Sequence, residues 1–163
     1  MIKIRPYKST DYKKIVKFEE ELQDYLVQMD PLKLIRRTKE FSTVFINDIF
    51  DQIKKFSGRI YIAEIPDKKQ IIGFIAGIIR KSSKLDMVQN IPLMRGRVIE
   101  LYVEPEYRGK KVAAKLMNEM EKYFKNKKCT IMKVEVFKPN TRAHRFYEKC
   151  GFQERVIDMI KEI

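Results

Sequence analysis

The chain opens with a short alternating segment followed by two stretches of helical periodicity. Residues 2–5 alternate apolar and basic side chains and predict a first strand. Apolar residues then recur three and four positions apart, first after a helix cap at Ser9 or Thr10 and again after Pro31. The two stripes comprise Tyr12, Ile15, Val16, Leu22 and Leu26, and Phe41, Phe45, Ile49 and Ile53. This pattern predicts two amphipathic helices, and we expect Gly58 to end the second.

The centre of the chain has the pattern of β-strands. The runs RIYIAEI and IIGFIAGII flank a turn-forming cluster, Pro66 to Lys69, and predict a hairpin. Lys81–Gly96 shows no clear period and is expected to be a connecting loop. Val98–Val103 is rich in apolar residues and predicts the next strand.

The last third of the chain alternates between helical and strand patterns. One helical face comprises Val112, Leu116, Met120 and Tyr123. Thr130–Phe137 predicts a strand, Pro139 and Asn140 open a helix that ends at Cys150, and Phe152–Ile163 is expected to form one or two last strands. Because each of the two strands before this tail is followed by a helix, we expect a mixed sheet with at least one parallel pair. The predicted fold class is therefore α/β, of the α+β type.

Composition limits the class of protein. The 163 residues, 44% hydrophobic and 35% charged, fit a single globular domain spanning residues 1–163. No apolar run is long enough for a membrane helix, and the N-terminus lacks the apolar core of a signal peptide, so we expect a cytoplasmic protein without membrane contact. Cys129 and Cys150 are expected to be reduced, buried thiols, and with one histidine in the chain we expect no metal site.

The net charge of +13 raises the question of a polyanionic partner. The basic residues are spread along the whole chain and are not gathered in a tail or arm. This distribution favours solvated faces and an anionic small ligand over a dedicated nucleic-acid-binding segment.

The segment YRGKKVAAKL, residues 107–116, places a short basic loop between a predicted strand and a predicted helix. A helix N-terminus presents unpaired backbone N–H groups and a partial positive charge, and both attract phosphate. Gly109 allows the backbone to curl around an anion, while Arg108, Lys110 and Lys111 add positive charge. The segment is a candidate phosphate site. The alternative is an ordinary strand-to-helix turn whose basic residues are solvated.

The segment NTRAHRFYEKCGF, residues 140–152, is the second candidate. On a helix, Ala143, Phe146, Tyr147 and Cys150 share one face, and His144 and Glu148 lie on the opposite side. A half-buried phenol such as Tyr147 requires a polar partner and can act as a general acid. The alternative is that Tyr147 only packs at the helix end. No base is placed to activate Cys150, so we do not expect it to be a nucleophile.

Together, the two segments resemble motifs of the GNAT superfamily of acetyl-CoA-dependent N-acetyltransferases. The first is similar to the pyrophosphate loop Gln/Arg-x-x-Gly-x-Gly/Ala, with Arg108 and Ala113 at its first and last positions. Lys111 stands where the family has its usual glycine, and Gly109 lies two residues earlier. The second resembles the family's Asn-x-x-Ala-x-x-Phe-Tyr-x-x-x-Gly-Phe helix. The resemblance covers nearly the whole chain and implies a three-layer fold, with a mostly antiparallel mixed sheet, a splayed parallel central pair and flanking helices.

The resemblance also implies where acetyl-CoA binds. Backbone groups of the central strand would pair with the pantetheine arm, which Asn140 would also contact, and the pyrophosphate would rest on N–H groups of the loop and first helical turn. The expected cosubstrate-binding residues are Leu101, Tyr102, Val103, Arg108, Gly109, Lys110, Lys111, Val112, Ala113, Ala114 and Asn140.

Two residues are expected to act in catalysis. By resemblance, Tyr147 is placed to protonate the leaving thiolate. Glu100 is the expected base, because a carboxylate in the middle of a strand is unusual and similar enzymes often place a base there. The alternative for Glu100 is an ion pair with a neighbouring Lys or Arg. Strand alternation puts Val98, Glu100, Tyr102 and Glu104 on one face and Ile99, Leu101 and Val103 on the other.

The acceptor is expected to be a primary amine that attacks the thioester directly. In similar enzymes the first two helices shape the acceptor site, and here that region carries Glu19, Glu20, Glu21, Asp24 and Asp30. An acidic rim would favour a small cationic amine; the alternative is an exposed acidic helix face. Two other functions stay open: transfer to a protein lysine or N-terminus, and a non-catalytic domain that binds CoA or nucleic acid for regulation. A homodimer is also compatible with the sequence.

Overall fold

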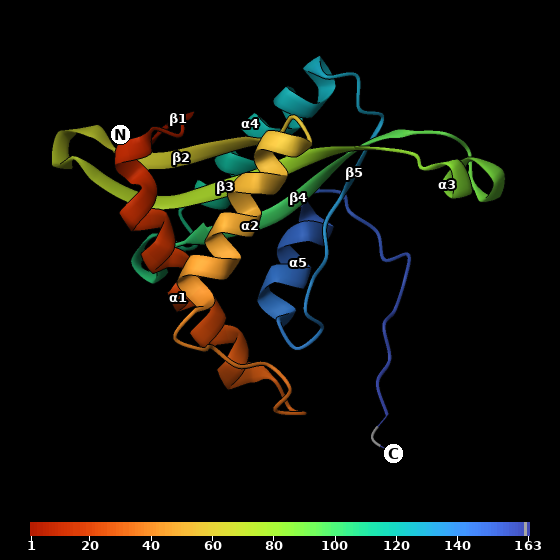
Figure 1. Cartoon of the computed structure of the whole chain (residues 1–163). Coiled ribbons are helices and arrows are strands. Elements are labelled where there is room, and N and C mark those ends of the chain that lie inside the picture. The colour runs from red at the N-terminus through yellow and green to blue at the C-terminus, as the bar shows by residue number, and fades with distance from the viewer. Residues whose placement is uncertain (162) are drawn as a thin grey trace.

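A five-stranded sheet forms the centre of the protein in a computed structural model, which describes residues 1–161 and 163 (Figure 1). The strands are β1 (Lys3–Pro6), β2 (Arg59–Ile65), β3 (Gln70–Lys81), β4 (Met94–Val103) and β5 (Ile131–Lys133). They lie in the order β1-β2-β3-β4-β5. Neighbouring strands are antiparallel except β4 and β5, which are parallel.

Helices cover both faces of this sheet (Figure 1). They are α1 (Tyr12–Met29), α2 (Phe41–Lys55), α3 (Lys84–Gln89), α4 (Val112–Asn126) and α5 (Thr141–Lys149), with 3-10 turns at Ser9–Asp11, Pro66–Lys68 and Pro105–Tyr107. The apolar stripes of α1 and α2 pack on one face around Phe18 and Phe74, and α4 packs on the other face around Leu116 and Phe124. The predicted three-layer α+β fold is confirmed.

Glycines allow α4 to lie close to the sheet. A Cβ atom on Gly96 would stand 2.3 Å from Cδ2 of Phe124, and one on Gly77 would stand 2.7 Å from Sδ of Met120. Side chains at these two positions would clash with the helix. The close approach fixes α4, and with it the loop that leads from β4 into its first turn.

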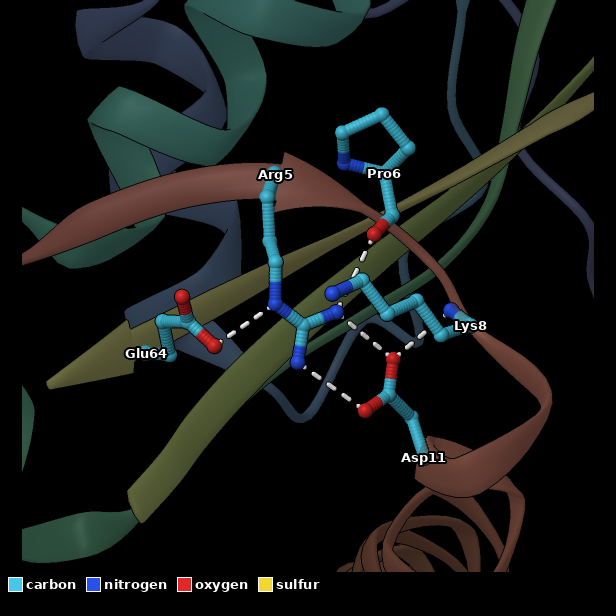
Figure 2. Close-up of polar contacts among 5 residues, drawn as sticks. All are labelled: Arg5, Pro6, Lys8, Asp11 and Glu64. Carbon is cyan, nitrogen blue, oxygen red and sulfur yellow. Dashed lines mark hydrogen bonds and ion pairs between the residues drawn. The ribbon is translucent and has the colours of Figure 1, made fainter. Parts of the chain in front are cut away.

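Arg5 ties β1 to the start of α1 and to β2 (Figure 2). Its guanidinium donates two hydrogen bonds to the carboxylate of buried Asp11, at 2.7 and 2.9 Å, and a third to Oε2 of Glu64 at 2.6 Å. Asp11 also accepts the backbone N–H of Lys8 at 2.8 Å. The predicted caps at Ser9 or Thr10 are therefore wrong: these residues form a 3-10 turn before α1, and the carboxylate that organises the turn is Asp11.

Replacing Asp11 with Asn should lower the unfolding free energy by about 2–3 kcal/mol at pH 7, because a buried guanidinium loses one of its two carboxylates. Burial alone would raise the pKa of Asp11, but the Arg5 guanidinium and the Lys8 N–H hold it below its ordinary value. The ionised form is thus favoured by folding, and the stabilisation is complete above the ordinary pKa and is lost as pH falls through the lowered one. Urea unfolding from pH 7 to pH 2 checks both points. Asp67→Asn, whose side chain is 85% exposed, serves as control and should change stability by less than about 0.5 kcal/mol; an equal loss in both variants would contradict the role of Asp11.

The segment Lys81–Gly96 is more ordered than predicted. β3 continues to Lys81 and β4 begins at Met94, so the two strands form a long arm whose tip carries the short helix α3 (Figure 1). Ser83 caps α3 by accepting the N–H of Asp86 at 3.1 Å. The helix was missed because its two turns are too short to show an apolar period.

The C-terminal prediction is wrong within the described residues. β5 covers Ile131–Lys133 and not the whole of Thr130–Phe137, and residues 152–161 form no strand. Ile163 is also outside any strand, and Glu162, which the prediction included, lies outside the described residues. Phe152 packs on Tyr147, but beyond it the apolar side chains are exposed and the tail runs away from the sheet (Figure 1). Without a neighbouring edge or buried surface, nothing offsets the entropy cost of forming a strand.

Candidate active site

The parallel pair at the edge of the sheet is splayed. β4 and β5 are paired only from Arg95 to Arg97, opposite Ile131 to Lys133. From Val98 to Val103, therefore, β4 has a strand partner on one side only in the described part of the chain. This leaves an open edge of backbone N–H and C=O groups beside α5, a position where an extended ligand can add as a strand.

The expected cosubstrate residues on β4 do not all face this open edge. Glu104 N–H donates to the Ile72 carbonyl at 2.9 Å, and the alternation of an antiparallel ladder then directs the backbone of Tyr102 toward β3 as well. The backbone groups of Leu101 and Val103 point the other way. Arg108 Nε donates to the Val103 carbonyl at 2.9 Å, which leaves the N–H of Val103 and both groups of Leu101 for a ligand.

The Tyr102 side chain is buried and has a structural role. It is 4% exposed, stacks on Phe18 with ring centroids 4.7 Å apart, and donates its hydroxyl to Glu21 at 2.5 Å. Burial is the main cause of the raised pKa of Tyr102, and the Glu21 carboxylate raises it further. The phenol therefore stays protonated and holds α1 against β4.

The basic loop contains two residues in the left-handed region, which glycine adopts most easily. Gly109 has φ +75°, and Lys111 has φ +61° and ψ +15°, a left-handed helical conformation at the N-cap of α4. No side chain of the described residues caps this end of the helix, so the N–H groups of its first turn, including those of Val112, Ala113 and Ala114, are available to an anion. Lys110 and Lys111 are both exposed beside them.

Replacing Lys111 with Gly should raise the unfolding free energy by about 0.5–1 kcal/mol, because a non-glycine residue pays for the left-handed conformation. Lys110→Gly removes the same charge at a position without positive φ. This variant should lower the unfolding free energy by a similar amount. Thermal and urea unfolding of the two variants give the comparison. Equal destabilisation by both would show that Lys111 carries no backbone strain.

Positive charge gathers near the open edge. The guanidiniums of Arg108 and Arg142 lie over the ring of Tyr25 at 6.0 and 5.4 Å from its centroid. Burial and the nearby charge of Arg142 lower the pKa of Arg108 below its ordinary value. An anion bound between the two arginines would relieve this repulsion.

Glu100 lies on the same face of β4 as Tyr102, toward α1 and α2, and a bulge next to it changes the faces of the two residues before it. The pairing passes from Ala76–Glu100 to Gly77–Val98, so Ile99 is an extra residue without a partner in β3. Val98 consequently packs in the α4 layer and Ile99 in the α1/α2 layer. The predicted faces are right for Leu101, Val103 and Tyr102, but wrong for Val98 and Ile99, because an uninterrupted alternation does not allow for the bulge.

Glu100 is not in an ion pair within the described part of the chain. No Lys or Arg nitrogen lies within 4.0 Å of its carboxyl in the part of the chain that the structure describes. Burial raises the pKa of Glu100 from its ordinary 4.5 to about 8. The alternative of a stabilising ion pair is thus not supported, and a carboxyl with this pKa is well matched to accepting a proton near neutral pH.

Tyr147 lies on α5 close enough to Glu100 for their charges to interact. Burial is the main cause of the raised pKa of Tyr147, and the charges of Glu100 and Cys150 raise it further. Its ring packs against Phe146 and Phe152, with centroids 5.3 and 5.6 Å away. The phenol is therefore protonated at neutral pH and held in one place, as a proton donor must be.

Comparison with known proteins identifies the family. The model of the Acetyltransferase (GNAT) family matches residues 18–152. The chain belongs to the GNAT family of acetyltransferases. Members of this family use acetyl-CoA as the acetyl donor, and the open β4 edge and the α4 N-terminus are suited to its pantetheine and phosphate groups.

Relatives of this GNAT chain are distant. It is 29% identical over 96 residues to an uncharacterized N-acetyltransferase, MJ1530, of Methanocaldococcus jannaschii; the match covers 58% of this chain and 53% of that one. The chain thus spans about half the length of this curated relative. A tetramutant of the BH1408 protein from Bacillus halodurans has a TM-score of 0.84 at 15% identity, with 99% of each chain covered. Glucosamine-6-phosphate N-acetyltransferase from Arabidopsis thaliana has a TM-score of 0.69 at 18% identity, covering 99% of this chain and 98% of that one. These structures share the fold.

A pocket of about 700 Å³ opens between α2 and β4 and reaches Glu100. Its polar wall on α2 consists of Asp48, Asp51, Gln52 and Lys55, and further lining residues include Arg80, Arg97 and Glu135. The apolar pattern of the sequence did not indicate these α2 residues. Their spacing of three, four and seven positions places them on one helical face, and this polar face was the signal that could have found them.

The acidic residues of α1 do not form the predicted rim. Glu20 accepts the Ser42 hydroxyl, Glu21 accepts that of Tyr102, and Asp24 pairs with Arg37 at 2.6 Å. Asp30 accepts the N–H groups of three residues in the following loop. Glu19 is buried. The alternative of an exposed helix face is also wrong for Glu19 and Asp30, because these carboxyls organise the interior and the loop.

The other residues considered in the sequence, Asn140, His144 and the two cysteines, differ in their surroundings. Asn140 caps α5, its Oδ1 accepting the N–H of Ala143 at 3.2 Å, so only its amide NH₂ remains for a ligand. His144 is on the surface beside Glu148 and Glu154. Cys129 and Cys150 are free thiols as predicted, but Cys150 is exposed and not buried.

The described residues, 1–161 and 163, contain neither a membrane-spanning helix nor a group of metal ligands. Within this range no helix combines the length and the apolar character needed to cross a membrane. Nor do three or more His, Cys, Asp or Glu side chains gather there into a group that could hold a metal ion.

Proposed function

We propose that the protein is an acetyl-CoA-dependent N-acetyltransferase whose acceptor is a primary amine, with a small cationic amine favoured. One observation carries this proposal: the pocket between α2 and β4 ends at Glu100, a carboxyl without a basic partner, next to the open edge of β4. Family membership supplies the reaction class, and the pocket supplies a separate entrance for the acceptor.

The proposed acetyl-CoA site runs along the open edge of β4 to the start of α4. Leu101 and Val103 would pair with the pantetheine arm through their free backbone groups, and the amide NH₂ of Asn140 would contact it from α5. The pyrophosphate would accept N–H groups from the loop and first turn of α4, with Arg108, Lys110 and Lys111 supplying positive charge.

The proposed reaction is direct attack by the neutral amine on the thioester carbonyl. A C–N bond forms, the C–S bond breaks, and the electron pair leaves on sulfur. Glu100 takes one proton from the amine, and Tyr147 gives its phenolic proton to the thiolate. The pKa values of both groups are raised by burial, which makes one a better base and keeps the other protonated.

Charge in the pocket supports a cationic acceptor. Asp51 is exposed and Asp48 accepts only Gln52, at 2.6 Å, so both can receive an ammonium group. The basic lining groups are engaged: Arg97 pairs with Glu135 at 2.9 Å, and Lys55 and Arg80 lie on the ring of Phe56. A second amino group of the acceptor would be bound by these two aspartates.

The test measures release of free CoA thiol from acetyl-CoA with an amine panel. Diamines and polyamines should react faster than monoamines of equal length, and Asp48→Asn with Asp51→Asn should remove that preference while leaving the rate with monoamines. Reaction with lysine peptides or protein N-termini but not with diamines would instead support a protein acetyltransferase. No thiol release with any amine, together with salt-sensitive binding of nucleic acid, would support the non-catalytic alternative.

A further inference from the structure

Glu19 is an exception among the acidic residues of α1. Its side chain is 1% exposed, and its Oε1 atom is fully buried without a hydrogen-bond partner among the described residues. Its neighbours Glu20, Glu21 and Asp24 all accept hydrogen bonds from side chains. An ionised carboxyl that is buried without a hydrogen-bond partner destabilises the fold. Such a carboxyl is therefore expected to be neutral or to serve a function.

A second carboxyl, that of Glu100, lies on the part of β4 that this segment of α1 packs against: Phe18 and Glu21 both contact Tyr102, two residues after Glu100 on the same face of the strand. Burial raises the pKa of Glu19 well above its ordinary value, and the charge of Glu100, reaching across the contact of α1 with β4, raises it further. Two carboxyls so placed cannot both be ionised at neutral pH. Glu19 is 1% exposed, whereas Glu100 is half-buried and reaches the pocket, so the negative charge is better solvated on Glu100 and Glu19 keeps its proton.

Groups on the surrounding elements do not neutralise this pair. They are Lys14 of α1, Asp48, Asp51 and Lys55 of α2, Arg80 of β3, Arg97 of β4, Glu135, and Tyr147 of α5. Lys14 is bound to Glu104 at 2.6 Å and Arg97 to Glu135, while Lys55 and Arg80 lie on Phe56. No lysine or arginine of this set is thus free to act as a donor to Glu100, and the Tyr147 phenol has its own role on the leaving thiolate in the proposed reaction. A protonated Glu19 can supply the donor from α1.

We propose that Glu19 is a positioning residue that stays a neutral carboxylic acid and supplies an O–H donor beside the Glu100 carboxylate. The inference rests on the proposed function, in which Glu100 must be ionised to accept the proton of the amine. A neutral donor stabilises the ionised form of a buried carboxyl without adding a second charge. Glu19 thus helps to keep the half-buried Glu100 ionised where the pocket reaches it, at a place where no Lys or Arg nitrogen of the described residues lies within 4.0 Å.

Two substitutions separate the donor from the charge. Glu19→Gln keeps a neutral hydrogen-bond donor of nearly the same shape, and the midpoint of the pH profile of kcat/KM should remain within about half a pH unit of the wild type. Glu19→Leu keeps the volume without a donor, and the midpoint should rise by about one unit or more, with roughly a tenfold loss of activity at pH 7. Glu119→Gln, on the far helix α4, is the control and should change neither.

Two kinetic outcomes would overturn the proposal. Loss of activity in Glu19→Gln as complete as in Glu100→Gln would mean that Glu19 acts as an ionised base. A midpoint in Glu19→Leu equal to that of the wild type would mean that Glu19 only fills space.

Infrared titration of the protein alone tests the protonation without any substrate. At pH 10, where Glu100 is ionised, the carbonyl band of a protonated carboxyl should persist in the wild type and be absent in Glu19→Gln, whether or not Glu19→Leu folds. Absence of the band from the wild type overturns the inference. A persistent band in a protein that acetylates no amine supports the protonated Glu19 and overturns the proposed function alone.

Discussion

Glu100→Gln is expected to lower kcat/KM for acetyl transfer by about 10²–10⁴-fold at pH 8, because glutamine is nearly isosteric with glutamate but cannot accept a proton. The wild-type profile should rise with pH through a midpoint near 8, since burial raises the pKa of Glu100 to that value and the base must be unprotonated to act. Steady-state thiol release measured from pH 6 to pH 10 gives the profile for both proteins.

The control for this variant is Glu106→Gln, an exposed residue in the 3-10 turn after β4 that should retain full activity. Acetyl-CoA affinity should be within about twofold of wild type in Glu100→Gln, because the carboxyl faces the acceptor pocket and not the cosubstrate edge. A Glu100→Gln enzyme that keeps the same rise in activity near pH 8 would exclude Glu100 as the base.

Tyr147→Phe is expected to lower kcat by about 10²–10³-fold while changing the Kd for acetyl-CoA by less than about twofold. Phenylalanine preserves the packing against Phe146 and Phe152 and removes only the phenolic proton, which burial and the charge of Glu100 keep in place at neutral pH. Stopped-flow measurement of the chemical step and calorimetric titration of acetyl-CoA separate the two quantities.

Tyr12→Phe provides a matched control, because Tyr12 lies on the outer part of α1 with 37% of its surface exposed. It should leave both kcat and the Kd unchanged. If Tyr147→Phe turned over at the wild-type rate, the leaving thiolate would be protonated by another group, and Tyr147 would be only a packed aromatic at the end of α5.

The sequence was sufficient for most of the fold because the apolar periods are clear. The stripes of α1, α2 and α4 predicted the two helical layers, and the alternating runs predicted β2 and β3. The bulge at Ile99 could not be predicted, since a bulge changes the pairing with β3 and not the pattern within β4. The missing strands in residues 152–161 have a related cause: whether an apolar segment forms a strand depends on a free edge elsewhere in the fold.

The candidate site was predictable where short motifs define it and not where distant elements meet. The α4 loop, Asn140 and Tyr147 came from two local segments. Glu19 was placed in an acidic rim, although its position four residues after Ile15 and three before Leu22 puts it on the apolar stripe of α1. Its proximity to Glu100, 81 positions later in the chain, appears only once α1 packs on β4.

The proposed function depends above all on whether the α4 N-terminus and its loop hold the diphosphate of acetyl-CoA. Isothermal titration calorimetry with CoA and with pantetheine, which lacks the diphosphate and the nucleotide, tests this most directly. We predict a Kd for CoA in the range of about 1–100 μM that rises with salt, and binding of pantetheine at least about 100-fold weaker. No heat and no thermal shift with CoA, or equal affinity for CoA and pantetheine, would contradict the account.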